Sequence, residues 1–150
     1  MKDKTGIKGH IKLVLRGPDG KIKQVYEHSN TITELLDAHV ADQMSDSGDS
    51  GIGFMAVGTS SGQTSASTGL ATANDINALT STTQGSSGAD NDVVYVGDWA
   101  AGDATATITE AGIFLANNNT TLMTYDDSMS IVKGASDTLQ ITWTLTFGAS

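Results

Sequence analysis

The final ten-residue segment, residues 138–147, constrains the fold more than any other feature of the chain. Large apolar side chains alternate there without error with polar ones, four of which are threonines. A β-strand places successive side chains on opposite faces, so one face enters a core and the other meets water or a partner. The apolar positions are Leu139, Ile141, Trp143, Leu145 and Phe147.

The N-terminal segment predicts a β-hairpin. Ile11, Leu13 and Leu15 alternate with more polar neighbours, and residues 22–26 form a second strand. Between the two strands, residues 17–20 read Gly-Pro-Asp-Gly, a turn sequence in which proline fixes φ and glycine supplies a positive φ. The polar face of the second strand carries Lys21 and Lys23, so the basic residues are expected to project together from this ribbon.

Residues 31–45 predict the one convincing helix. Thr31 followed by Glu34 fits a capping box, and apolar residues from Ile32 to Met44 recur at spacings of three and four. His39 lies near the edge of this stripe, where a packed side chain is a better interpretation than a metal ligand.

The remaining segments predict a mainly β body. Short strands are expected at 52–57, 93–96, 105–115 with an interruption at Gly112, 122–125 and 131–133. Residues 59–92 are polar, and we expect an exposed loop that packs on the sheet or on a neighbouring subunit, with part of residues 70–79 forming a short helix. The chain therefore predicts a single domain, residues 1–150, with a basic hairpin or arm at 1–29. The body at 30–150 is predicted to be a β-sandwich or jelly-roll of about seven or eight strands with one amphipathic helix.

Charge is distributed unevenly along the chain. Its net value of −9 argues against nucleic acid or an anionic membrane as partner. Seven of the eight basic residues nevertheless lie within the first 23 residues, whereas residues 24–150 hold only Lys133 against fifteen acidic residues. Such asymmetry favours an interaction surface, although lysines on short strands can also simply protect sheet edges. The candidate contact residues are Lys2, Lys4, Lys8, Lys12, Lys21 and Lys23.

Catalytic and metal-binding motifs are weak. The absence of cysteine excludes disulfides and thiolate chemistry, and no apolar run or N-terminal signal predicts a membrane or secretory segment. Residues 58–62 match G-x-S-x-G, but all three histidines precede Ser60 and no helix pattern follows it. Three histidines at unrelated spacings predict no metal site. Weak calcium binding by loop carboxylates is conceivable without matching an EF-hand, the candidates being Asp46, Asp49, Asp90 and Asp92. We therefore expect no enzyme, cofactor or small-molecule substrate.

From residue 54 onward the order of segments resembles a group of structural proteins of tailed bacteriophages. The matching pieces are residues 54–59, 108–114 and 137–147, with Lys133 shortly before the last, and residues 30–33 with the following helix also fit. The pattern covers roughly residues 30–147, and its most specific parts are the blocks T-E-A-G-I-F and T-W-T-L-T-F. These blocks contain Glu110, Gly112, Phe114, Trp143 and Phe147. We expect Glu110 to cap or pair at a tight bend that Gly112 permits.

The leading hypothesis that this resemblance implies is a capsid cement (decoration) protein. Such a protein binds the outer shell of the virion as a homo-oligomer, here a dimer or trimer, and stabilises contacts between capsomers. Its partners are then the major capsid protein and copies of itself, after synthesis in the cytoplasm of the bacterial host. The alternative is a tail-fibre or baseplate component whose polar segment 59–92 contacts a receptor or a neighbouring tail protein. A small hydrolase or carbohydrate-binding module is a third hypothesis from a different class.

Overall fold

The computed structural model describes residues 6–45, 51–85 and 91–148. They form one helix, α1 (Glu34–Met44), and eleven strands. The strands are β1 (Ile7–Arg16), β2 (Ile22–Ile32), β3 (Phe54–Gly58), β4 (Ala73–Ala78), β5 (Ser81–Gln84), β6 (Asp92–Trp99), β7 (Ala106–Ile108), β8 (Glu110–Phe114), β9 (Leu122–Asp126), β10 (Ile131–Lys133) and β11 (Thr138–Phe147).

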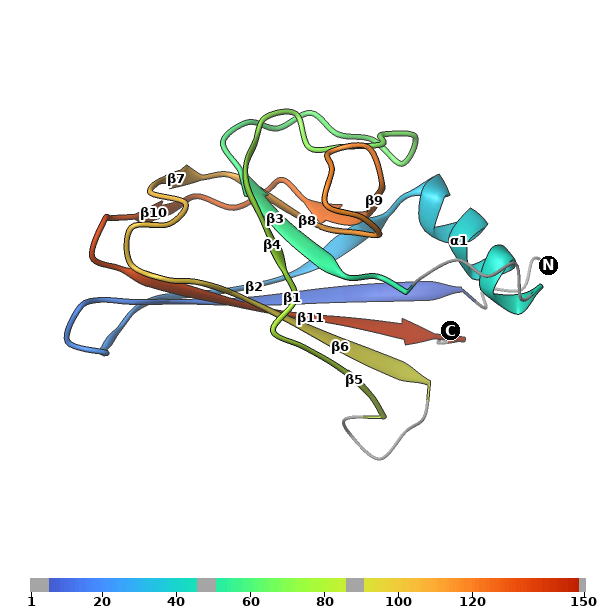
Figure 1. Ribbon diagram of the computed structural model, residues 1–150, viewed down its shortest axis with the longest axis horizontal. Helices are drawn as coiled ribbons and strands as arrows, with labels where there is room; N and C mark the ends of the chain where they lie inside the picture. The colour runs from blue at the N-terminus through green and yellow to red at the C-terminus, as the bar shows by residue number, and fades with distance from the viewer. Residues whose placement is uncertain (1–5, 46–50, 86–90, 149–150) are drawn as a thin grey trace.

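Nine strands form one antiparallel sheet in the order β4-β3-β8-β9-β2-β1-β11-β6-β5, and β10 and β7 pair separately. The two end strands, β4 and β5, are consecutive in the chain and are joined only by Leu79 and Thr80. Backbone hydrogen bonds hold this link to both sides, from Leu79 N to Gly53 O at 3.0 Å and from Thr80 N to Val96 O at 2.8 Å. The sheet therefore curls until its two ends meet (Figure 1).

The predicted fold is confirmed at the level of a mainly β chain with one helix, but its details differ. Eleven strands are present rather than seven or eight, because the polar segment 59–92 contains β4 and β5 and the expected strand 105–115 is divided into β7 and β8. The short helix expected around residues 70–79 is wrong, since residues 73–78 pair with β3. A strand with short polar side chains shows no clear hydrophobic pattern in the sequence, and hydrogen bonds to its neighbouring strands stabilise it.

The predicted hairpin is present as β1 and β2. Gly20 has φ +80°, and the turn closes with hydrogen bonds from Gly17 N to Lys21 O and from Gly20 N to Gly17 O. On the inward side of β1, Ile11, Leu13 and Leu15 are buried. The alternation in the sequence therefore determined which face of the hairpin enters the core.

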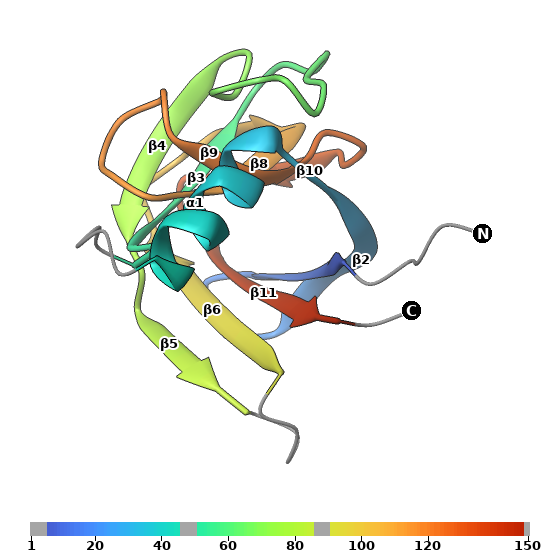
Figure 2. The same cartoon turned by 90° about the vertical axis from the view of Figure 1, so that its right-hand side faces the viewer.

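The helix begins three residues later than the sequence predicts. Thr31 and Ile32 continue β2 and pair with β9, so the capping box at Thr31 is wrong. Thr33 is the N-cap, and its side chain accepts from Leu36 N while donating to the carbonyl oxygens of residues 122 and 123. His39 is buried in packing, as predicted. The helix lies across one open end of the curled sheet (Figure 2).

Two apolar layers stabilise the body. The main core lies inside the curl and includes Trp99 and Trp143, with Phe147 half-buried at its margin. A smaller cluster on the outer side of β3, β8 and β9 contains Phe114 and Leu70. The segment 59–72 lies over this second face, which explains why every residue of β8 and β9 is buried.

Candidate interaction surface

The outward face of β1 carries three of the six lysine and arginine side chains in the described residues. Lys8, His10, Lys12 and Arg16 are exposed because they alternate with the buried residues of the same strand. His10 Nε2 lies 3.2 Å from Glu27 Oε1 on the neighbouring strand, whereas Lys8 and Lys12 form no salt bridge within the described ranges. These two cations are therefore available to an external partner.

Neutral short side chains continue this face across the next strands. In the pairing register Lys12 lies beside Thr142, and Thr142 lies beside Val96 of β6. One row along, His10 lies beside Thr144, and Thr144 lies beside Val94. The resulting surface consists of threonine and valine side chains bordered on one side by the basic row of β1. A hollow of about 370 Å³, lined in part by Lys8, His10 and Thr144, opens at one end of it. We call this surface the β1–β11 face.

The other candidate lysines occupy different positions. Lys23 Nζ lies 2.9 Å from Asp137 Oδ2, and this hydrogen-bonded ammonium, together with the Gly134 amide, holds the pKa of the Asp137 carboxyl below its usual value. Lys21 is exposed at the turn. Lys23 thus connects β2 to the loop before β11. Lys2 and Lys4 lie outside the described residues.

Glu110 organises the polar segment that covers β8. Its side chain is fully buried, and its carboxylate accepts hydrogen bonds at 2.9 Å from the backbone N–H groups of Ser60, Ala71 and Thr72. The Gln63 side-chain amide donates to the same carboxylate. The tight bend expected here is absent, since Glu110 and Gly112 both lie in β8, and the hydrogen-bond partners of Glu110 come from a segment about forty to fifty residues away.

Gly112 allows other segments to pack closely against β8. It sits in the middle of β8, and the break in the predicted strand 105–115 falls at Thr109 instead, between β7 and β8. A Cβ at Gly112 would lie 2.4 Å from Leu122 Cδ1 and 3.0 Å from Thr124 O. The glycine therefore allows β9 and the segment containing Leu70 to approach β8 closely.

The G-x-S-x-G match has no catalytic geometry. In the described residues no helix follows β3, and the Ser60 backbone N–H is bonded to Glu110 while its carbonyl accepts from the Thr109 hydroxyl. Within the described ranges no group of three or more histidine or acidic side chains could hold a metal ion. Asp46, Asp49 and Asp90, named above for calcium, lie outside those ranges.

The sequence predicted no site or contact role for Lys133. It is 1% exposed, and its Nζ donates to Ala100 O at 3.0 Å. Burial lowers the pKa of this ammonium, while the nearby carboxylates of Asp103, Asp137 and Asp75 act in the opposite direction. The signal in the sequence was its isolation, since Lys133 is the sole basic residue between positions 24 and 150.

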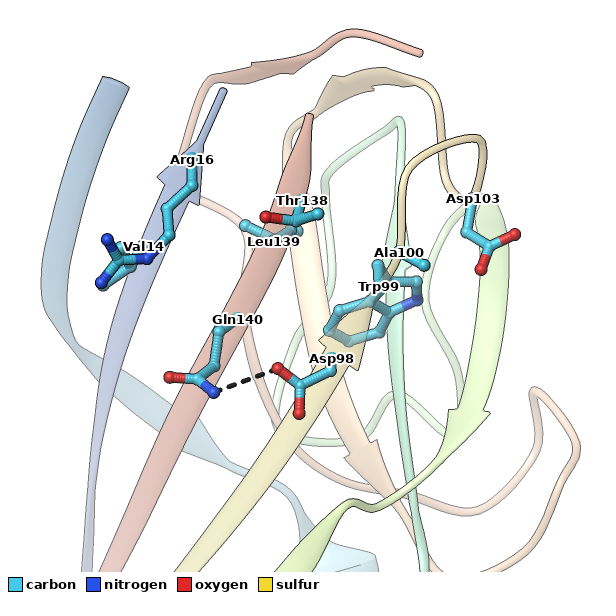
Figure 3. A pocket seen from close by; sticks show the side chains of 9 residues that line it. All are labelled: Val14, Arg16, Asp98, Trp99, Ala100, Asp103, Thr138, Leu139 and Gln140. Carbon is cyan, nitrogen blue, oxygen red and sulfur yellow. Dashed lines mark hydrogen bonds between the residues drawn. The ribbon is translucent and has the colours of Figure 1, made fainter. Parts of the chain in front are cut away.

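A groove of about 520 Å³ opens where β6 ends, beside the outward residues Val14 and Arg16 of β1 (Figure 3). Gln140 Nε2 donates to Asp98 Oδ1 at 3.0 Å, and Thr80 Oγ1 donates to Asp98 Oδ2. The described lining residues include two carboxylates and an arginine but no histidine, so the groove does not assemble a nucleophile with a histidine base.

Comparison with known proteins gives no assignment: no family model, no curated protein and no solved structure matches the chain. No helix within the described part of the chain is long and apolar enough to span a membrane.

Proposed function

We propose that the chain is a structural protein of a bacteriophage virion, a capsid cement protein that attaches as an oligomer to the outer shell. The resemblance of residues 30–147 to such proteins, through the blocks around Glu110 and Trp143, motivates this function. We further propose that the curled sheet is a variant of the β-sandwich or jelly-roll architecture.

The observation that carries the proposal is the β1–β11 face. Lys8 and Lys12 project from a sheet surface that continues over β11 and β6 as threonine and valine side chains, with Glu27 of β2 beside Lys12 on the other side. A sheet surface of this kind suits contact with another protein, since it offers broad area and a cationic border. The basic border favours an acidic patch on the shell as its partner, and the net charge of −9 argues against nucleic acid.

The stabilising mechanism is mass action. A protein that binds only the assembled shell shifts the equilibrium toward assembly, and several weak contacts in one oligomer reinforce each other through effective concentration. No chemical transformation is required of the cement protein.

Charge reversal at Lys2, Lys4, Lys8 and Lys12 to Glu tests this role. We expect fewer copies of the variant on purified particles than of the wild type, with the largest deficit at low salt, as measured by quantitative mass spectrometry. The minimal variant Lys8→Gln with Lys12→Gln is compared with Thr107→Glu plus Asn117→Asp, which changes net charge equally at exposed positions elsewhere. Equal occupancy of all variants would overturn the role of the basic row.

Copy number separates the proposal from the tail alternative. A cement protein is present in hundreds of copies per particle, whereas a tail-fibre or baseplate component is present in a few or tens. The alternative relied on segment 59–92 contacting a receptor. Residues 60, 71 and 72 of that segment instead bond inward to Glu110, which leaves less of the segment to meet a receptor.

A further inference from the structure

The hollow at one end of the β1–β11 face gathers a cation and several hydroxyl groups. It has a volume of about 370 Å³ and lies where β1 begins and β11 ends (Figure 1). Within the described residues no aspartate or glutamate lines it. Its polar lining comes from three neighbouring strands and consists of Lys8, His10, Ser29, Asn30, Thr144 and Thr146.

The register of the sheet brings most of these side chains together in two adjacent rows. His10 of β1 has Ser29 of β2 on one side and Thr144 of β11 on the other. In the next row Lys8 lies beside Thr146. Residues two apart on a strand project from the same face, so the ammonium, the imidazole and the three hydroxyl groups all lie on one side of the sheet.

Most of these groups have no partner within the described residues. Lys8 forms no salt bridge there, and no hydrogen bond there engages any of the three hydroxyl groups. His10 is different, since its Nε2 lies 3.2 Å from Glu27 Oε1. The hollow therefore offers one ammonium and three hydroxyl groups for hydrogen bonds to a molecule outside the chain.

The charges around the hollow favour a ligand group with a single negative charge. Lys8 supplies one positive charge, and its ammonium donates strong hydrogen bonds to charged oxygen atoms. Two acidic residues flank the same face, namely Glu27 beside His10 and Asp92 of β6, which is the register partner of Thr146. Because like charges repel, these two residues oppose a doubly charged phosphate more strongly than a singly charged carboxylate.

We propose that this hollow is a carboxylate-binding site, in which Lys8 and the neighbouring hydroxyl groups hold the side chain of an aspartate or glutamate of the partner protein. The hollow is larger than one carboxylate group, so the methylene groups of that side chain also enter it and contact Ile7. The site gives the basic border of the β1–β11 face a specific point of attachment in addition to its general positive charge. The inference rests on the proposed function for the identity of the partner, whereas the binding chemistry belongs to this chain alone.

Nuclear magnetic resonance of the purified full chain tests the site with small molecules. The first is N-acetyl-glutamate-N-methylamide, whose only carboxylate is that of the side chain, and its glutamine counterpart is the neutral control. As the glutamate compound is added at constant ionic strength, amide signals of the residues that line the hollow are expected to shift and saturate, while the glutamine compound leaves them in place. Inorganic phosphate at the same pH and ionic strength is expected to bind more weakly than the glutamate compound.

Matched variants distinguish the site from the general charge of the basic row. Lys8→Gln is expected to weaken binding of the glutamate compound about three- to tenfold, as for a contact to an exposed ammonium. Lys12→Gln removes the same charge from the same strand but not from the hollow, so a smaller effect is expected. Thr146→Val removes one hydroxyl group with little change of shape and should also weaken binding, whereas Thr138→Val at the other end of β11 should not. The spectra themselves show that each variant is folded.

Three results would overturn the proposal: no saturable shift at the hollow, equal binding of the glutamate and glutamine compounds, or equal weakening by Lys8→Gln and Lys12→Gln. Tighter binding of phosphate than of the glutamate compound would also contradict it, since the site would then recognise a phosphate group. These outcomes are distinct from those of the shell experiment. The isolated chain can bind a carboxylate without being a virion protein, and a chain that lacks this site can still attach to particles through other contacts.

Discussion

The buried carboxylate of Glu110 gives the sharpest prediction about stability. In Glu110→Gln one acceptor oxygen becomes an NH₂ group. If that group replaces Oε2, the N–H groups of Ser60 and Thr72 both lose their acceptor. If it replaces Oε1, only the Ala71 N–H is orphaned, because the Gln63 amide has an unpartnered oxygen and can reverse to accept from the new NH₂.

The second orientation costs less free energy, so it determines how much stability Glu110→Gln loses. One hydrogen bond to a charged group is lost and one buried donor is left unsatisfied, which together lower the free energy of unfolding by about 2–4 kcal/mol. Glu110→Ala orphans all three backbone donors, and we expect a loss of about 4 kcal/mol or more, moderated by water entering the space that the side chain leaves.

Urea unfolding at fixed pH measures these differences, and amide hydrogen exchange at Ala71 and Thr72 locates them. Glu27→Gln is the matched control. It makes the same change of charge and shape at a side chain that is 54% exposed with one ion pair to His10, so about 0.5 kcal/mol or less is expected. Similar unfolding free energies for Glu110→Gln and Glu27→Gln would refute the assigned role of Glu110.

Two further predictions follow from the ion pair and the close packing. Lys23 holds the folded-state pKa of Asp137 below its ordinary value of 3.8, so the stability it contributes is present above that value and disappears as pH falls through the folded-state value. In Lys23→Gln, acid unfolding followed by circular dichroism should therefore begin at higher pH. In Gly112→Ala the new methyl group meets a leucine side chain at 2.4 Å and a backbone oxygen at 3.0 Å, and urea unfolding should show a loss of about 1–3 kcal/mol.

Each of these two predictions has a matched control variant. Lys21→Gln removes the same charge from a side chain that forms no salt bridge within the described ranges, and its acid unfolding should match that of the wild type. If acid unfolding of Lys23→Gln does not begin at a higher pH than that of Lys21→Gln, the ion pair between Lys23 and Asp137 does not stabilise the fold. Gly51→Ala places a methyl group in open space, so a loss as large as that of Gly112→Ala would show that packing at β8 is not the cause.

Local patterns in the sequence predicted several elements well because those elements depend on neighbouring residues. The turn at residues 17–20 places β1 against β2, and the alternation in residues 138–147 places Trp143 in the core and threonines outside. The β10 strand also lies at the predicted residues 131–133. In each case the signal and the structure span fewer than a dozen residues.

The helix start shows where local reasoning failed. Thr31 and Thr33 are equally good caps by residue type, and only the pairing of Thr31 with Tyr125 keeps the first of them in β2. Likewise Lys23 and Lys8 are indistinguishable as surface lysines in the sequence, but the loop before β11 brings Asp137 against Lys23 alone. Contacts between residues about a hundred positions apart decided both outcomes.

The sequence by itself determined the mainly β class, the inward and outward faces of β1 and β11, and the concentration of positive charge at the N-terminal end. Periodicity and composition carry these properties, and both are local. Only the tertiary structure decided that segment 59–72 folds onto Glu110, that β4 and β5 are the two end strands of the sheet, and that Lys133 is buried. Those features depend on backbone hydrogen bonds and desolvation supplied by distant strands, and serine, threonine and glycine side chains encode no period that reveals them.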